Sequence, residues 1–229
     1  MGQHGSGHLV AGGVAVIAVL IPTLGRPANV QRVIDNLEPT APRNLIDPIF
    51  IVEAHDTDTI DAIAALQRTY IVNTRSASYA GAINTAVLAT THDHLFIGSD
   101  DLHFYDGWAQ PLLDLAKRYG MVGTNDLHNP DVLAGEHATH YLVTRDYANL
   151  GTIDGSEPLL HEGYAHNYCD TEAVATAKHR GQFRPCMESV VEHLHWAWGL
   201  VNIDDTYNKG VRTVSADAAL FASRAHLWT

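Results

Sequence analysis

The chain has few cysteines, few basic residues and no long apolar run. Its only cysteines, Cys169 and Cys186, form no ligand motif, so we expect free thiols and no disulfide framework. Lysine and arginine number 14 against 26 aspartates and glutamates, and the resulting net charge of −12 provides no long-range attraction for nucleic acid. No stretch reaches the roughly 20 apolar residues that a membrane-spanning helix requires. We therefore expect no membrane span and a cytoplasmic location.

The first apolar run, Val10–Ile21, does not match a secretory signal. It is short, it is interrupted by Gly12 and Gly13, and no cationic stretch precedes it. No internal repeat or long linker divides the rest of the chain. We expect residues 1–13 to be disordered and residues 14–229 to form one domain.

Strand and helix patterns alternate through the first half of the chain. β-Branched and apolar runs predict buried strands, at Val14–Ile21, Pro48–Glu53, Tyr70–Asn73 and His94–Gly98. Apolar residues at helical spacing predict helices, at Ala28–Leu37, Thr59–Thr69 and Tyr79–Thr90, with later ones at Thr171–His179 and around Asp204–Lys209. This alternation is typical of a Rossmann-like α/β fold, with a mostly parallel sheet and helices on both faces.

Polar side chains follow several of these strands. In parallel sheets, ligands bind beyond the carboxyl ends of the strands, and Thr23, Glu53 and the pair Asp100–Asp101 stand at such ends. Adjacent carboxylates repel one another unless a cation or a basic group lies between them. Mg²⁺ or Mn²⁺ would suit these oxygen ligands, whereas a helix cap or solvated turn would need no metal. The pair alone leaves both interpretations open.

The order of the motifs resembles the family 2 glycosyltransferases, which have the GT-A fold. The similar segments are Val19–Arg26, Ile51–Glu53, Ala80–Asn84, Ser99–Asp101, Gly163–Glu172 and Lys178–Gly181. The resemblance implies a sugar donor bound in residues 14–120, with residues 121–229 supplying the acceptor side and completing the metal site. It implies metal-dependent transfer from a nucleoside-diphosphate sugar, a UDP-sugar being favoured. The acceptor would be a hydroxyl on a glycan, a protein or a modified DNA base.

The resemblance also assigns donor and metal residues. Donor contacts are implied for Pro22, Thr23, Leu24, Arg26, Glu53, Asn84, Ser99 and Asp100. Ser99 stands in place of the first Asp of the family's Asp-x-Asp signature, so Asp101 corresponds to the usual ligand of Mn²⁺ or Mg²⁺. Glu53 stands where the family usually has Asp.

Asp170 stands where the family has its general base, and Cys169 replaces the Glu that usually precedes it. A carboxylate at the start of a helix is held ionised by the helix N-terminus. Such a group can take the proton of an acceptor hydroxyl, and a single displacement would invert the anomeric centre. The alternative role for Asp170 is a plain helix cap.

His193 and His195 lie in the segment Val190–Trp196, which reads as a strand, so both would face the same side. In related GT-A enzymes a histidine from this region completes the metal site. Both are therefore metal-ligand candidates: His193 is favoured, and His195 alternatively orients a ligand. The short chain and the run Asp204–Tyr207 are similar to small glycosyltransferases of bacteriophages, which would act in the host cytoplasm.

Two other functions stay open from the sequence. A nucleotidyltransferase would also combine an α/β fold with metal and nucleoside phosphates, but Leu24–Pro27 matches its Gly-rich, basic first loop poorly. A non-catalytic nucleotide-sugar binding module would be expected to have lost its acidic motif, whereas Asp101 and Asp170 are present. Measured turnover separates these functions.

Overall fold

The computed structural model describes residues 16–228, so the disorder expected for residues 1–13 lies outside the described part. The first half contains β1 (Ile17–Pro22), α1 (Pro27–Leu37), η1 (Glu38–Thr40), β2 (Ile46–Val52), α2 (Thr57–Ala65), β3 (Thr69–Val72), α3 (Tyr79–Ala89), β4 (His94–Ile97), β5 (Leu102–Phe104) and α4 (Ala109–Ala116). The second half contains β6 (Met121–Asn125), α5 (Pro130–Leu133), β7 (Tyr141–Thr144), α6 (Arg145–Ala148), α7 (Cys169–His179), β8 (Phe183–His193), η2 (Trp196–Trp198), α8 (Asp205–Arg224) and η3 (Ala225–Trp228).

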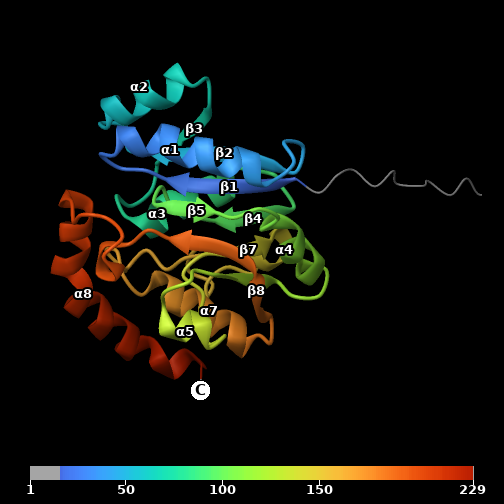
Figure 1. Ribbon diagram of the computed structural model, residues 1–229. Coiled ribbons are helices and arrows are strands. Elements are labelled where there is room, and N and C mark those ends of the chain that lie inside the picture. Colours follow the sequence, from blue (N-terminus) through green and yellow to red (C-terminus); the bar gives the residue numbers. More distant parts are fainter. Residues whose placement is uncertain (1–15, 229) are drawn as a thin grey trace, which may run out of the picture.

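The strands form one sheet in the order β3-β2-β1-β4-β7-β6-β8-β5 (Figure 1). Parallel pairing joins β3 to β2, β2 to β1, β1 to β4 and β6 to β8. Strand β7 runs antiparallel to both β4 and β6, and β5 runs antiparallel to β8. The predicted α/β fold with a mostly parallel sheet is confirmed, and both halves of the chain contribute strands to that sheet.

Helices cover both faces of the sheet. On β1, successive side chains point to opposite faces: Val19 and Ile21 pack in a cluster with α1, α2 and α4, whereas Ala18 and Leu20 pack in a cluster with α3, α6 and α7. Burial on both faces explains why these strands are continuous apolar runs in the sequence.

Several element boundaries differ from the predicted ones, and α2, β8 and α8 show the clearest differences. Helix α2 ends at Ala65 rather than Thr69, because Gln67 adopts a positive φ of 54° that turns the chain into β3. Strand β8 ends at His193, so the predicted strand does not extend to Trp196. Helix α8 continues to Arg224, far beyond the short helix predicted around Asp204–Lys209.

Helix α8 is held against the loop that leads into α7. The carboxylate of Asp217 accepts hydrogen bonds from three successive backbone N–H groups, those of residues 165–167, at 2.9, 3.1 and 2.8 Å. A Cβ at Gly210 would lie 2.5 Å from the His166 ring, so glycine permits this close approach. In Figure 1, α8 runs along the outer side of the half that carries α7. Within residues 16–228, no helix is both long enough and apolar enough to cross a bilayer.

Candidate active site

A cavity of about 720 Å³ opens beside the loop that follows β4. Five of the 15 histidines line it together with four acidic groups, and these residues are Asp101, Asp131, Glu136, His137, His140, His166, Asp170, His193 and His195. A smaller cavity of about 150 Å³ adjoins it, since Tyr79, His166 and Thr206 line both. The small and the large cavity are therefore neighbours in the same region of the molecule.

The smaller cavity brings together four of the predicted donor residues. Pro22 ends β1, Thr23 and Leu24 follow it, and Glu53 follows β2. These strands are parallel neighbours, with Pro22 opposite Ile51, so their following loops lie at the same edge of the sheet. The side-chain amide of Asn73 donates to Glu53 at 2.7 Å and holds its carboxylate in place.

Asp100 and Asp101 follow β4 and are only 3% and 5% exposed. Arg26 lies between them: its Nη1 is 2.9 Å from Oδ1 of Asp100 and 3.7 Å from Oδ2 of Asp101. Burial and the like charge of Asp101 raise the pKa of Asp100 to about 7, although Arg26 opposes the rise. Arg26 thus supplies the basic group that adjacent carboxylates require.

Arg26 also joins the carboxylate pair to the start of α8. Its Nε and Nη2 donate to the carboxylate of Asp204 at 2.7 and 3.0 Å, and its guanidinium lies 4.2 Å from the centre of the Tyr207 ring. Arg26 was expected to contact the donor, but in this structure carboxylates and an aromatic ring surround it. The loop after β1 is therefore tied to a helix almost 180 residues later.

Asp101 is held by hydroxyl groups from two sides. Tyr207 donates to its Oδ2 at 2.7 Å, and Ser99 donates to its Oδ1. Burial alone would raise the pKa of Asp101, but His193 and Ser99 hold it well below its usual range. Asp101 therefore faces the large cavity as an ionised carboxylate.

The structure brings His193 and His195 to Asp101. Nε2 of His193 is 3.5 Å from Oδ2 of Asp101, and the two imidazole rings are 4.9 Å apart. Burial lowers the pKa of His195 to about 4, so this ring is neutral at physiological pH. Burial would also lower the pKa of His193, but the charge of Asp101 outweighs it and raises the value.

These side chains fit a metal site in which substrate phosphates would provide the remaining ligands. Across residues 16–228, no three His, Cys, Asp or Glu side chains are grouped so that they could hold a metal by themselves. Asp101 and His193 offer one carboxylate and one imidazole, and Mg²⁺ is commonly bound by one or two carboxylates plus substrate phosphates. In addition, Oδ2 of Asp100 is buried without a hydrogen-bond partner among the described residues. The donor set suits an open site rather than a closed structural one.

Asp170 lies on the wall of the same cavity, in the first turn of α7. Its Oδ1 accepts the backbone N–H of Thr171 at 2.8 Å, and its Oδ2 is 3.3 Å from Nε2 of His137. His137 comes from the loop between α5 and β7, and no sequence pattern singles it out. It reaches Asp170 only because this loop folds back onto α7.

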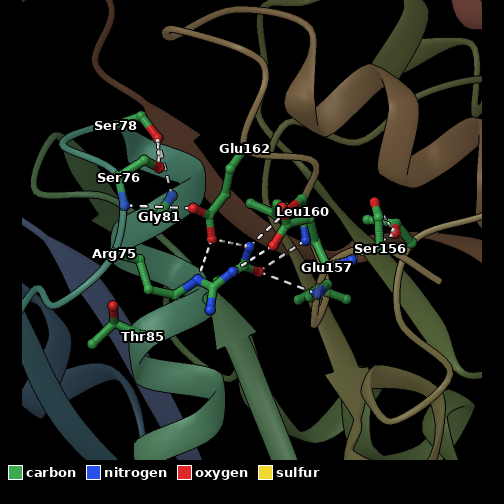
Figure 2. A network of polar contacts seen from close by, with 12 residues as sticks. Arg75, Ser76, Ser78, Gly81, Thr85, Ser156, Glu157, Leu160 and Glu162 are labelled. Carbon is green, nitrogen blue, oxygen red and sulfur yellow. Dashed lines mark hydrogen bonds and ion pairs between the residues drawn. The ribbon is translucent and has the colours of Figure 1, made fainter. Parts of the chain in front are cut away.

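Asn84, predicted to contact the donor, lines neither of these two cavities. It is fully buried in α3, where its Oδ1 accepts the backbone N–H groups of Leu159 and Leu160 at 3.1 and 3.0 Å. Its Nδ2 donates to the carbonyl of Leu160 at 2.7 Å and to Glu162 at 2.9 Å. Figure 2 shows Glu162 reaching Arg75 across the same junction. The amide of Asn84 therefore fastens α3 to the loop before α7.

Comparisons with known proteins agree with this architecture. Glucosyl-3-phosphoglycerate synthase from Mycobacterium tuberculosis, solved with Mn²⁺, UDP and phosphoglyceric acid, has a TM-score of 0.65 at 13% identity, over 89% of this chain and 77% of that one. A mannosyltransferase from Pyrobaculum calidifontis, solved with GDP-Man and Mn²⁺, has a TM-score of 0.57 at 18% identity, over 80% of this chain and 59% of that one. At these identities the likeness shows a common GT-A fold.

The sequence comparisons are more specific. No curated protein matches the chain in sequence. The model of the glycosyl transferase family 2 matches residues 18–185, a span that runs from β1 to the start of β8 and includes Asp101 and Asp170. Because this match covers well over half of the sequence, the chain belongs to glycosyltransferase family 2.

Proposed function

We propose that the protein transfers a sugar from a nucleoside-diphosphate sugar to an acceptor hydroxyl, with inversion. The carrying observation is that Asp101, His193 and Asp170 line one cavity, and that a narrower cavity lies next to it. Membership of a glycosyltransferase family argues against the nucleotidyltransferase. The presence of both Asp101 and Asp170 in the cavity argues against a non-catalytic module.

The narrow cavity receives the nucleoside of the donor. Pro22, Thr23, Leu24 and Glu53 line it, and its volume of about 150 Å³ suits a single-ring base better than a double-ring base. A UDP-sugar is therefore the favoured donor, in keeping with the UDP found in one structural neighbour. From there the diphosphate extends past Ser99 toward Asp101.

The carboxylate pair forms the diphosphate end of the site. A Mn²⁺ or Mg²⁺ ion held by Asp101 and His193 would neutralise charge on the departing nucleoside diphosphate. Tyr207 and Ser99 fix the orientation of the Asp101 carboxylate, and His195 lies beside it as a neutral ring. The other carboxylate, that of Asp100, is held by an ion pair with Arg26.

The wide cavity receives the acceptor. Its volume of about 720 Å³ leaves room for an acceptor group on a glycan, a protein or a modified DNA base. Removal of the acceptor's proton depends on Asp170, which faces this space from the first turn of α7. Attack by the deprotonated hydroxyl on the face opposite the diphosphate inverts the anomeric carbon in a single step.

A donor panel tests this proposal directly. We expect release of nucleoside diphosphate from at least one of UDP-, GDP- and TDP-sugars with Mn²⁺ or Mg²⁺, and its loss in Asp101→Ala. The matched control is Asp114→Ala, because Asp114 is exposed on α4, outside both cavities. Tight binding of a nucleotide-sugar with no turnover under any condition would instead indicate the non-catalytic module.

A further inference from the structure

Three residues line both the narrow and the wide cavity, and they are Tyr79, His166 and Thr206. The hydroxyl of Tyr79 donates to the carbonyl of Gly98 at 2.9 Å, and that of Thr206 donates to the carbonyl of Leu24 at 3.2 Å. The imidazole of His166, in contrast, makes no hydrogen bond or ion pair with any described residue. Of the three, only His166 therefore keeps all of its hydrogen-bonding groups for a ligand.

The ring nitrogens of His166 are accessible. Several buried side-chain atoms have no partner among the described residues, and these include Nδ1 of His140 and Nδ1 of His161 but no nitrogen of His166. A nitrogen that has no partner and is not sealed inside the protein is open to solvent. Because His166 lines both cavities, a molecule that fills the space where they adjoin can reach its ring.

Helix α8 fixes the position of this ring. Asp217 of α8, only 2% exposed, accepts the backbone N–H groups of residues 165–167, including that of His166 at 3.1 Å. A Cβ at Gly210 would lie 2.5 Å from Cδ2 of the ring, so α8 packs directly against the imidazole. The ring is thus held without a hydrogen bond to either nitrogen, and a ligand that binds it has little ordering cost to meet.

The charge state of His166 favours an uncharged ligand group. Burial lowers its pKa below the ordinary value of 6.5, and the charges of Asp101, Asp217 and Asp170 do not offset this effect. A neutral imidazole has one N–H donor and one acceptor nitrogen, which matches a hydroxyl group, since a hydroxyl also donates and accepts. Phosphate oxygens, in contrast, are bound most strongly by cationic donors.

We propose that His166 binds a hydroxyl group of the sugar that is transferred, and that it thereby contributes to the choice of donor sugar. This inference rests on the proposed glycosyl transfer. With the nucleoside in the narrow cavity and the acceptor beside Asp170 in the wide one, the sugar lies between them. That is the place of His166, which lines both cavities.

The test compares a nucleotide sugar with the nucleoside diphosphate that it releases. The probes are the nucleotide sugar with the highest wild-type turnover in the donor panel and its own nucleoside diphosphate. Calorimetry, with the cation that supports this turnover, gives the Kd of each. His166→Leu removes both ring nitrogens and keeps a side chain of similar size. It should bind the nucleotide sugar about 5–50-fold more weakly, while its Kd for the nucleoside diphosphate stays at the wild-type value.

Two further variants separate the hydrogen bond from the shape of the site. His166→Gln keeps one donor and one acceptor, so it should bind the nucleotide sugar more tightly than His166→Leu does. Gly210→Ala leaves the imidazole intact but displaces it, because the added Cβ would overlap the ring. It should also weaken binding of the nucleotide sugar alone, and this result does not depend on the fold of the His166 variants.

The matched control is His92→Leu, because His92 is paired with Asp47 at 3.2 Å and lines neither cavity. This control should keep both Kd values.

Two outcomes overturn the inference alone. One is a wild-type Kd for the nucleotide sugar in both His166→Leu and Gly210→Ala, which would exclude a contact with the transferred sugar. The other is an equal loss of affinity for both probes, which would place the ring against the nucleoside or the diphosphate. Absence of wild-type turnover with every donor would overturn the proposed function and this inference with it.

Discussion

Replacing Asp100 with asparagine should stabilise the metal-free protein above neutral pH. Asp100 is almost fully buried after β4, and its Oδ2 has no hydrogen-bond partner among the residues described. Burial and the neighbouring charge of Asp101 raise its pKa to about 7, even though Arg26 is only 2.9 Å away. Keeping Asp100 ionised therefore opposes folding, and asparagine removes that charge without changing the shape of the side chain.

The expected size follows from the pKa of Asp100. In the unfolded chain this carboxyl has its ordinary value of 3.8, against about 7 in the fold. Between these values the folded protein holds a proton that the unfolded chain releases, so stability falls as the pH rises from about 4 to 7. At about 1.36 kcal/mol per pH unit, the loss reaches roughly 4 kcal/mol above pH 7. Allowing about 1–2 kcal/mol for a weaker hydrogen bond to Arg26, we expect Asp100→Asn to gain about 2–3 kcal/mol at pH 8.

Urea unfolding at pH 5, 6, 7 and 8 measures this gain. EDTA is present throughout, because a bound cation would offset the charge that the experiment measures. The stability difference between variant and wild type should grow from pH 5 to about pH 7 and level off by pH 8, at an unchanged m-value. Asp114→Asn, at an exposed position on α4, serves as the control and should show no such growth. Equal or lower stability of Asp100→Asn at pH 8 would refute the reasoning.

The remaining predictions concern the metal and two buried polar junctions. Excess EDTA should abolish transfer, and Mn²⁺ or Mg²⁺ should restore it; undiminished turnover in EDTA would contradict the metal role of Asp101 and His193. Asn84→Ala should lower the free energy of unfolding by roughly 2–3 kcal/mol, because it leaves two buried backbone N–H groups without an acceptor. Calorimetry should give this variant the wild-type Kd for the sugar donor. Tenfold weaker donor binding by a folded variant would instead show that Asn84 contributes to the donor site. Arg224→Leu should cost about 3–5 kcal/mol in urea unfolding, because Glu172, 2% exposed, would keep a buried charge without its partner at 2.8 Å. A loss below 1 kcal/mol would show that Glu172 is compensated elsewhere.

Features that depend on neighbouring residues could be predicted from the sequence. The strands are apolar runs because both faces of the sheet are buried, and Asp100 and Asp101 lie at a strand end because β4 stops just before them. The direction of β7 could not be predicted in the same way. Its antiparallel pairing with β4 and β6 depends on where a distant strand inserts, and an apolar run of four residues does not specify that.

The contacts that complete the site depend on tertiary structure. His137 meets Asp170 across 33 residues, through a loop whose path no local pattern indicates. Asn84 shows the opposite case, because a motif resemblance suggested a ligand contact where the fold uses the amide for two backbone groups 75 and 76 residues away. A buried asparagine with every hydrogen bond satisfied is a structural element.

Arg26 connects both ends of the chain at the carboxylate pair. Its guanidinium binds Asp100 from the loop after β4 and Asp204 at the start of α8, 178 residues along the chain. The next turn of α8 places the hydroxyl of Tyr207 on Asp101. Any displacement of α8 would therefore break the Tyr207 hydrogen bond to Asp101 and remove Asp204 from Arg26, the residue that binds Asp100. For this reason the position of the last helix and the charge state of Asp100 and Asp101 must be coupled, although they lie far apart in sequence.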